Sequence, residues 1–157
     1  MKVLIMYYSA TGVTAKMAEY IAEGVRFSGH DAVVKKVGDI KDAAELAGYD
    51  GYIFGSPTYS LDVPKPMKTF LSTAEKVNLR GKMSGAFGTY THDVSYKHDT
   101  HAPAIIFDIL QKEYKMKPFE LGAFALKEDI VETSEGMKTC QDYGRVFGES
   151  LGDSPSR

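Results

Sequence analysis

An alternation between short apolar runs and segments of helical periodicity constrains the fold of this chain most strongly. The first run, residues 2–8, is apolar at every position after Lys2, which is typical of a strand that is covered on both faces of a sheet. Parallel neighbours need crossover connections, and helices supply them. The pattern therefore predicts an α/β protein, a three-layer α/β/α sandwich around a five-stranded parallel sheet. We expect strands at residues 2–8, 32–37, 50–56, 83–88 and 119–125.

Apolar residues at spacings of three and four predict the helices between these strands. The first helix ends near Gly29, the second opens at Lys65 and Pro66, and the third starts at Pro103. A last helix follows the fifth strand. The expected buried stripes are Met17, Ala18, Ile21, Ala22 and Val25; Met67, Phe70, Leu71 and Ala74; Ile105, Ile106, Ile109 and Leu110; and Met137, Cys140, Gly144, Phe147 and Leu151.

Length and composition exclude several classes of protein. The 157 residues predict one domain over residues 1–152, followed by a flexible tail at 153–157. A hydrophobic content of 43% and a charged content of 25% exclude a disordered chain, and a net charge of -2 gives no basic field for nucleic acid. The single Cys140 excludes a disulfide scaffold, and the run at residues 3–8 is too short to span a membrane. We expect a cytoplasmic protein.

Hydroxyl side chains and a glycine lie where the first strand meets the first helix. The start of a helix offers unpaired N–H groups and a positive dipole end, so this loop is predicted to hold a phosphate. The sequence contains no Gly-x-Gly-x-x-Gly and no P-loop, which excludes the dinucleotide and Walker types of site. An ordinary helix cap is the alternative interpretation. The loop consists of Ser9, Ala10, Thr11, Gly12, Val13 and Thr14.

The motif Ser/Thr-x-Thr-Gly-x-Thr in this position resembles that of the flavodoxin family, and the resemblance extends over nearly the whole chain. It implies a sheet of order 2-1-3-4-5 and FMN as the cofactor. By this resemblance, Ser9, Thr11, Gly12, Val13 and Thr14 bind the FMN phosphate, and Ala10 is a spacer. Val13 is a departure from the pattern, because many members of the family carry asparagine there.

Two further loops leave the same edge of the sheet, after the third and fourth strands. Aromatic side chains suit the faces of a flat ring, and backbone groups suit its edges. The resemblance implies that Tyr59 or Tyr90 stacks on the isoalloxazine; the alternative is that these tyrosines pack against their own loops. The residues expected to bind the ring are Ser56, Pro57, Thr58, Tyr59 and Ser60, and Gly88, Thr89, Tyr90, Thr91, His92 and Asp93.

Other chemistry-bearing residues indicate no catalytic or metal site. Three histidines, at 92, 98 and 101, share one loop with two aspartates, but their irregular spacing does not bring ligands together. We therefore expect no metal, with a polar loop beside the flavin as the preferred interpretation. Cys140 lies on an apolar helix stripe and is expected in the core.

The predicted function is electron transfer by an FMN protein between redox protein partners, a reductase donor and an acceptor enzyme. The cofactor supplies the chemistry in such a carrier. We expect a monomer or weak dimer. An NAD(P)H:quinone oxidoreductase of the same superfamily is one alternative, and a flavodoxin-like binding module without cofactor is another.

Overall fold

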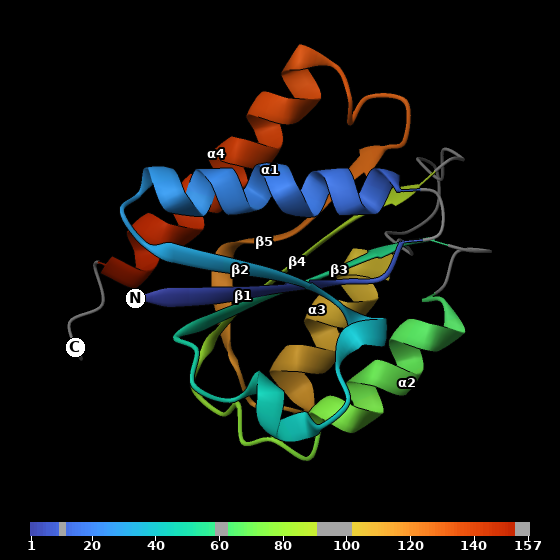
Figure 1. Cartoon of the computed structure of the whole chain (residues 1–157), viewed down its shortest axis with the longest axis vertical. Helices are drawn as coiled ribbons and strands as arrows, with labels where there is room; N and C mark the ends of the chain where they lie inside the picture. Colours follow the sequence, from blue (N-terminus) through green and yellow to red (C-terminus); the bar gives the residue numbers. More distant parts are fainter. Residues whose placement is uncertain (10–11, 59–62, 91–101, 153–157) are drawn as a thin grey trace.

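The computed structural model describes residues 1–9, 12–58, 63–90 and 102–152. Five parallel strands form one sheet of order β2-β1-β3-β4-β5, which confirms the predicted fold class and strand order. The strands run in the same direction, so their carboxyl ends share one edge of the sheet (Figure 1). They are β1 (Lys2–Tyr7), β2 (Asp31–Lys36), β3 (Gly51–Pro57), β4 (Met83–Tyr90) and β5 (Lys117–Lys127).

Helices cover both faces of the sheet (Figure 1). One face carries α1 (Val13–Phe27) and α4 (Ser134–Gly152), and the other carries α2 (Lys65–Ala74) and α3 (Ala102–Lys112). Two short 3-10 helices, η1 (Val37–Asp39) and η2 (Ala43–Leu46), connect β2 to β3. Among the described residues, no helix is both long and apolar enough to cross a membrane.

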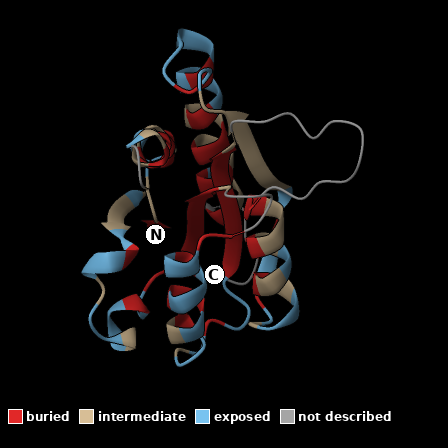
Figure 2. Cartoon of the chain, turned by 90° about the vertical axis from the view of Figure 1, so that its right-hand side faces the viewer, coloured by how far each residue is buried: buried red, intermediate tan, exposed pale blue. Residues whose placement is uncertain are grey.

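The core lies on both sides of the sheet, and the central strands are the most deeply buried part of the molecule (Figure 2). Every residue of β3 is buried, as is every residue of β1 after Lys2. The stripes expected on the first and second helices are buried as predicted. On α3, Ile106 and Leu110 are buried, whereas Ile105 and Ile109 are half-buried.

The stripe predicted for the last helix is wrong at its first position. Met137 is 36% exposed, whereas Cys140, Phe147 and Leu151 are buried. In the first turn of α4 it is Gly136 that faces the rest of the protein, since a Cβ built there would lie 2.0 Å from the Ile130 carbonyl oxygen. The backbone of α4 at Gly136 therefore occupies the buried position at which the Met137 side chain was expected.

Helices α1 and α4 approach each other closely. A Cβ built on Gly24 would lie 1.9 Å from the carbonyl oxygen of Gln141, and one built on Gly144 would lie 2.0 Å from that of Ile21. Real Cβ atoms do not tolerate such separations. The two glycines thus allow the short distance between α1 and α4, and in this way they position α1 over the sheet.

An irregularity interrupts the pairing of β4 with β5. Between the pair Ser84–Pro118 and the pair Ala86–Ala123, β4 advances by two residues and β5 by five. The hydroxyl of Tyr143, on α4, enters this gap. It donates to the Gly122 carbonyl oxygen at 2.6 Å and accepts from the Ala86 N–H at 3.2 Å. A side chain thus bonds backbone groups of both strands where their regular pairing is interrupted.

Candidate functional site

The predicted site residues that the structure describes gather at the carboxyl edge of the sheet. β1, β3 and β4 are consecutive there, and α1 begins beside them. The described residues of the predicted set are Ser9, Gly12, Val13, Thr14, Ser56, Pro57, Thr58, Gly88, Thr89 and Tyr90. The others, Ala10, Thr11, Tyr59, Ser60, Thr91, His92 and Asp93, lie outside the described residues, as do His98, His101 and the tail at 153–157.

The start of α1 has the properties of an anion site. Gly12 adopts φ +91°, its N–H donates to Ser9 Oγ at 3.0 Å, and its carbonyl oxygen accepts from the Lys16 N–H at 3.1 Å. Among the described residues, nothing accepts hydrogen bonds from the N–H groups of Val13, Thr14 and Ala15, and the first turn has no acidic side chain. A Cβ built on Gly12 would meet no atom within 4 Å. Within the described part of the chain, these donors thus have no acceptor at the positive end of the helix dipole.

Buried hydroxyls connect this helix start to the neighbouring strand. Thr14 Oγ1 and Thr89 Oγ1 are 3.2 Å apart, and both residues are 2% exposed. Ser56 is fully buried, and its hydroxyl donates to the Pro57 carbonyl oxygen at 2.8 Å. The threonine pair thus connects α1 with β4, at the edge where the predicted loops begin.

The ends of β3 and β4 are unusually close. A Cβ built on Gly88 would lie 1.9 Å from the Ser56 carbonyl oxygen and 2.8 Å from Pro103 Cγ. β3 extends through Pro57, which pairs with Thr89, and the ladder continues where the Thr58 N–H donates to the Thr89 carbonyl oxygen at 2.9 Å. Tyr90, the last residue of β4, is half-buried. Because Gly88 has no side chain, β3 and the start of α3 can both lie close to the backbone of β4 at this position.

Sequence reasoning missed an acidic cluster beside the start of α1. Val13 lines a cavity of about 430 Å³ together with Lys127, the last residue of β5, and with Glu128, Asp129 and Glu132, which follow it. The three carboxylates here repel a bound anion. The helix dipole attracts the anion, but by about 1 kcal/mol at most at an exposed site. Directed N–H donors are therefore the main attraction that this edge offers a phosphate. The polar run directly after the fifth strand was the signal that could have revealed the cluster.

Near the same edge, burial raises the pKa of Tyr7, at the end of β1, and the charges of Glu19 and Asp39 raise it further. Its phenol therefore stays neutral beside the helix start at neutral pH. No group of three or more histidine, cysteine or acidic side chains able to hold a metal occurs within the described ranges.

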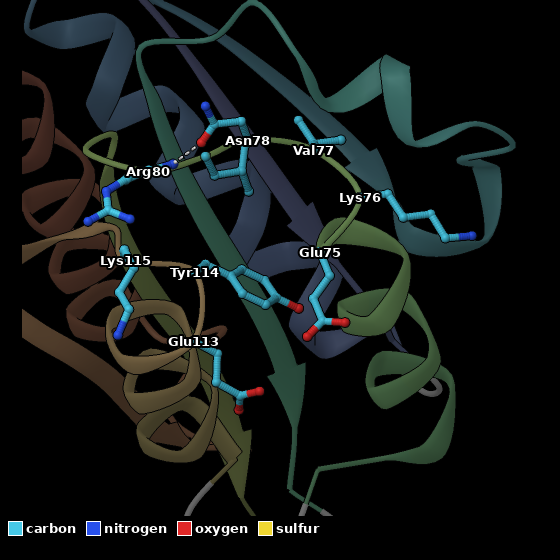
Figure 3. A pocket seen from close by; sticks show the side chains of 9 residues that line it. Glu75, Lys76, Val77, Asn78, Arg80, Glu113, Tyr114 and Lys115 are labelled. Atoms are coloured by element: carbon cyan, nitrogen blue, oxygen red, sulfur yellow. Dashed lines mark hydrogen bonds between the residues drawn. The ribbon is translucent and has the colours of Figure 1, made fainter.

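A second cavity lies at the opposite end of the sheet, before β4 and β5, and has a volume of about 560 Å³ (Figure 3). The Tyr114 hydroxyl donates to the Leu71 carbonyl oxygen near the end of α2. Burial raises the pKa of Tyr114, and the charges of Glu75 and Glu113 add to this effect. None of the predicted site residues lines this cavity. Its lining consists of Glu75, Lys76, Val77, Asn78, Leu79, Arg80, Glu113, Tyr114 and Lys115.

Cys140 is fully buried, as predicted, and burial raises the pKa of its thiol to about 12. We expect the thiol of the folded protein to resist an aromatic disulfide reagent at pH 8 and to react fully in guanidinium chloride, because the thiolate is the nucleophile. Since the thiol's reference pKa is 9.0, its contribution to stability is complete below pH 9 and is lost as pH rises from 9 to about 12.

Urea unfolding at several pH values checks the second expectation, with Cys140→Ala as the control. The variant should lose less stability between pH 9 and 12 than the wild type does. Equal losses in both proteins would show that the thiol does not contribute to the alkaline decline.

Together, the fold and this edge define a class: a doubly wound α/β protein whose first helix starts at the carboxyl ends of its strands, the place where such folds hold ligands. The family model described as flavodoxin domain matches residues 4–127. The chain therefore belongs to the flavodoxin family.

Individual relatives agree with this assignment. A flavodoxin of Clostridium saccharobutylicum is 39% identical over 89 residues, which are 57% of this chain and 56% of that protein. An NAD(P)H dehydrogenase (quinone) of Cupriavidus metallidurans is 30% identical over 128 residues, covering 69% of this chain and 64% of that protein. The chain thus spans less than two thirds of both proteins, and a quarter of the length of other curated relatives.

Among solved structures, a flavodoxin from the domain Archaea superimposes with a TM-score of 0.81 at 27% identity. The superposition covers 97% of this chain and 99% of that one. This likeness therefore extends over the whole sheet and its helices.

Proposed function

We propose that this protein binds FMN at the carboxyl edge of its sheet and carries electrons between a reductase and an acceptor protein in the cytoplasm. The observation that supports this most directly is the start of α1, where three N–H groups have no acceptor among the described residues and a Cβ built on Gly12 would meet no atom within 4 Å. Membership of the flavodoxin family supports the choice of cofactor. Bound FMN would supply the redox chemistry, since its ring accepts and releases electrons.

The chain's own residues would hold the phosphate through directed donors. The N–H groups of Val13, Thr14 and Ala15 point along the helix axis, as they do at the start of any helix. Gly12 keeps the approach free of side-chain atoms. We propose in addition that the loops containing Tyr59 and Tyr90 bind the ring, because both continue from strand ends beside this helix.

Titration of the purified protein with FMN tests the proposal. We expect one equivalent of FMN to bind, with quenching of its fluorescence and a shifted visible spectrum. Anaerobic addition of dithionite should bleach the complex, and NADPH with a quinone should not be consumed. A protein that leaves the fluorescence of FMN unchanged would contradict the proposal and favour a module without this cofactor.

Replacing Gly12 with alanine should weaken FMN binding at least tenfold, because the new Cβ occupies space that the phosphate needs. Gly29→Ala, at the other end of α1, is a matched control. Its φ is +92°, against +91° at Gly12, and a Cβ there also meets no atom within 4 Å. Both variants should lose about 1 kcal/mol of stability, since alanine is strained at positive φ.

Fluorescence titration gives the two affinities, and urea unfolding gives the two stabilities. An equal loss of affinity in both variants would show that strain in α1 causes the effect. That result would contradict the proposal that the phosphate binds next to Gly12.

An NAD(P)H:quinone oxidoreductase is the second candidate, and the similarity to the Cupriavidus dehydrogenase is what favours it. Rapid oxidation of NADPH by the FMN-loaded protein in the presence of a quinone would establish this function. A carrier would instead need a separate reductase before NADPH is consumed.

A further inference from the structure

Thr58 bonds two points of the chain that are far apart in sequence. Its N–H donates to the Thr89 carbonyl oxygen at 2.9 Å, near the end of β4. Its Oγ1 accepts from the N–H of Ala102, the first residue of α3, also at 2.9 Å. The segment 91–101 runs between these two anchoring points. One half-buried residue after β3 is therefore bonded both to the end of β4 and to the first residue of α3.

The bond to Ala102 is costly to lose. Ala102 is fully buried, so water cannot replace the hydroxyl as the acceptor for its N–H. Pro103, the next residue, has no N–H to donate. The Thr58 hydroxyl thus satisfies a donor in the first turn of α3 in the way that an N-cap does, although it comes from another element.

The same bonds continue to the start of α1. Thr89, which receives the Thr58 N–H, lies with its hydroxyl 3.2 Å from that of Thr14 in the first turn of α1. A connected series of hydrogen bonds therefore joins α3, the end of β3, β4 and α1. These are the elements from which the predicted phosphate and ring loops extend.

We propose that Thr58 is a positioning residue. Its hydroxyl fixes the start of α3 against the end of β3, and so sets the position of α3 relative to the ends of β3 and β4 and the start of α1. The sequence placed Thr58 among the ring-binding residues; because its hydroxyl already bonds Ala102, its side chain acts on the cofactor through α3 and not by direct contact. The effect on the cofactor rests on the proposed binding of FMN, whereas the effect on α3 does not.

Two substitutions separate the hydroxyl from the shape of the side chain. Thr58→Val keeps the shape and removes the acceptor, and Thr58→Ser keeps the acceptor. In FMN-free protein, we expect the Ala102 amide to exchange with solvent deuterium at least tenfold faster in the valine variant. The serine variant should exchange at nearly the wild-type rate. An unchanged rate in the valine variant would overturn the proposal whether or not FMN binds.

With FMN, the valine variant should bind about tenfold more weakly and show an altered visible spectrum, and serine should restore both. Thr133→Val is the matched control, because Thr133 Oγ1 accepts from the Gly136 N–H in the first turn of α4 at 3.0 Å. It should leave FMN affinity unchanged.

Two FMN results would overturn the positioning role. One is faster Ala102 exchange with unchanged affinity and spectrum. The other is equal loss of affinity in the valine and serine variants with normal exchange, which would indicate direct contact with the cofactor. If the wild type binds no FMN, the proposed function fails, and the exchange rates still decide whether Thr58 holds α3.

Discussion

Replacing Gly144 with alanine should lower the free energy of unfolding by about 3 kcal/mol, at the upper end of what overpacking usually costs. The added Cβ would lie 2.0 Å from the carbonyl oxygen of Ile21 and 3.0 Å from the Val25 nitrogen. Both atoms belong to the backbone of α1, so relief requires that one helix move away from the other. Such a movement would open the core that lies beneath both helices. Alanine's better helix propensity, about 1 kcal/mol, offsets only part of this cost.

Gly148→Ala, one turn further along α4, is the matched control. Its Cβ would lie 2.0 Å from Ser28 Oγ, a side-chain atom that can rotate away. Rotation gives up the bond of that hydroxyl to the Val25 carbonyl oxygen, which is worth about 1 kcal/mol. Because both substitutions gain the same helix propensity, the difference in their urea unfolding energies measures the backbone contact. Equal losses would show that α1 and α4 separate more easily than the structure implies.

Tyr143→Phe should cost about 2–3 kcal/mol, because it removes the hydroxyl that bonds the buried N–H of Ala86 and the part-buried carbonyl oxygen of Gly122. The phenol ring is 4% exposed, and its hydroxyl bonds the Ala86 N–H and the Gly122 carbonyl oxygen. Phenylalanine keeps the ring contacts with Phe119 and Phe124. The loss is therefore one of hydrogen bonds and not of packing. Urea unfolding followed by circular dichroism measures it.

Tyr114→Phe is the comparison for this variant. The Tyr114 hydroxyl also donates to a backbone carbonyl, that of Leu71, but this oxygen accepts the Glu75 N–H as well and is not left without a donor. We expect a loss of about 1 kcal/mol or less. Faster amide exchange at Ala86 in Tyr143→Phe alone would place the damage at the gap between β4 and β5. Normal exchange there would contradict the role given to Tyr143.

The sequence by itself predicted the elements whose burial follows a simple period. The apolar runs of β1 and β3 are continuous, as in strands covered on both faces, and the stripe Met17, Ile21 and Val25 follows the helical period; all are buried as expected. Alternation of these segments was enough to predict a parallel sandwich, because a crossover between parallel strands needs a helix. The hydroxyls and glycine before α1 likewise indicated an anion site, since a helix start always carries unpaired donors.

Only the tertiary structure decided the contacts made between elements. No pattern within β5 predicts its mismatch with β4, because the hydroxyl that fills the gap comes from α4. Gly136 displaces Met137 from the core for the same reason, since its partner is the carbonyl group of Ile130. The pair Thr14–Thr89 and the bond from Ala102 to Thr58 join residues 75 and 44 positions apart. The periodicity of a sequence indicates which face of a helix or strand is buried. Which residue of another element contacts that face depends on how the layers pack.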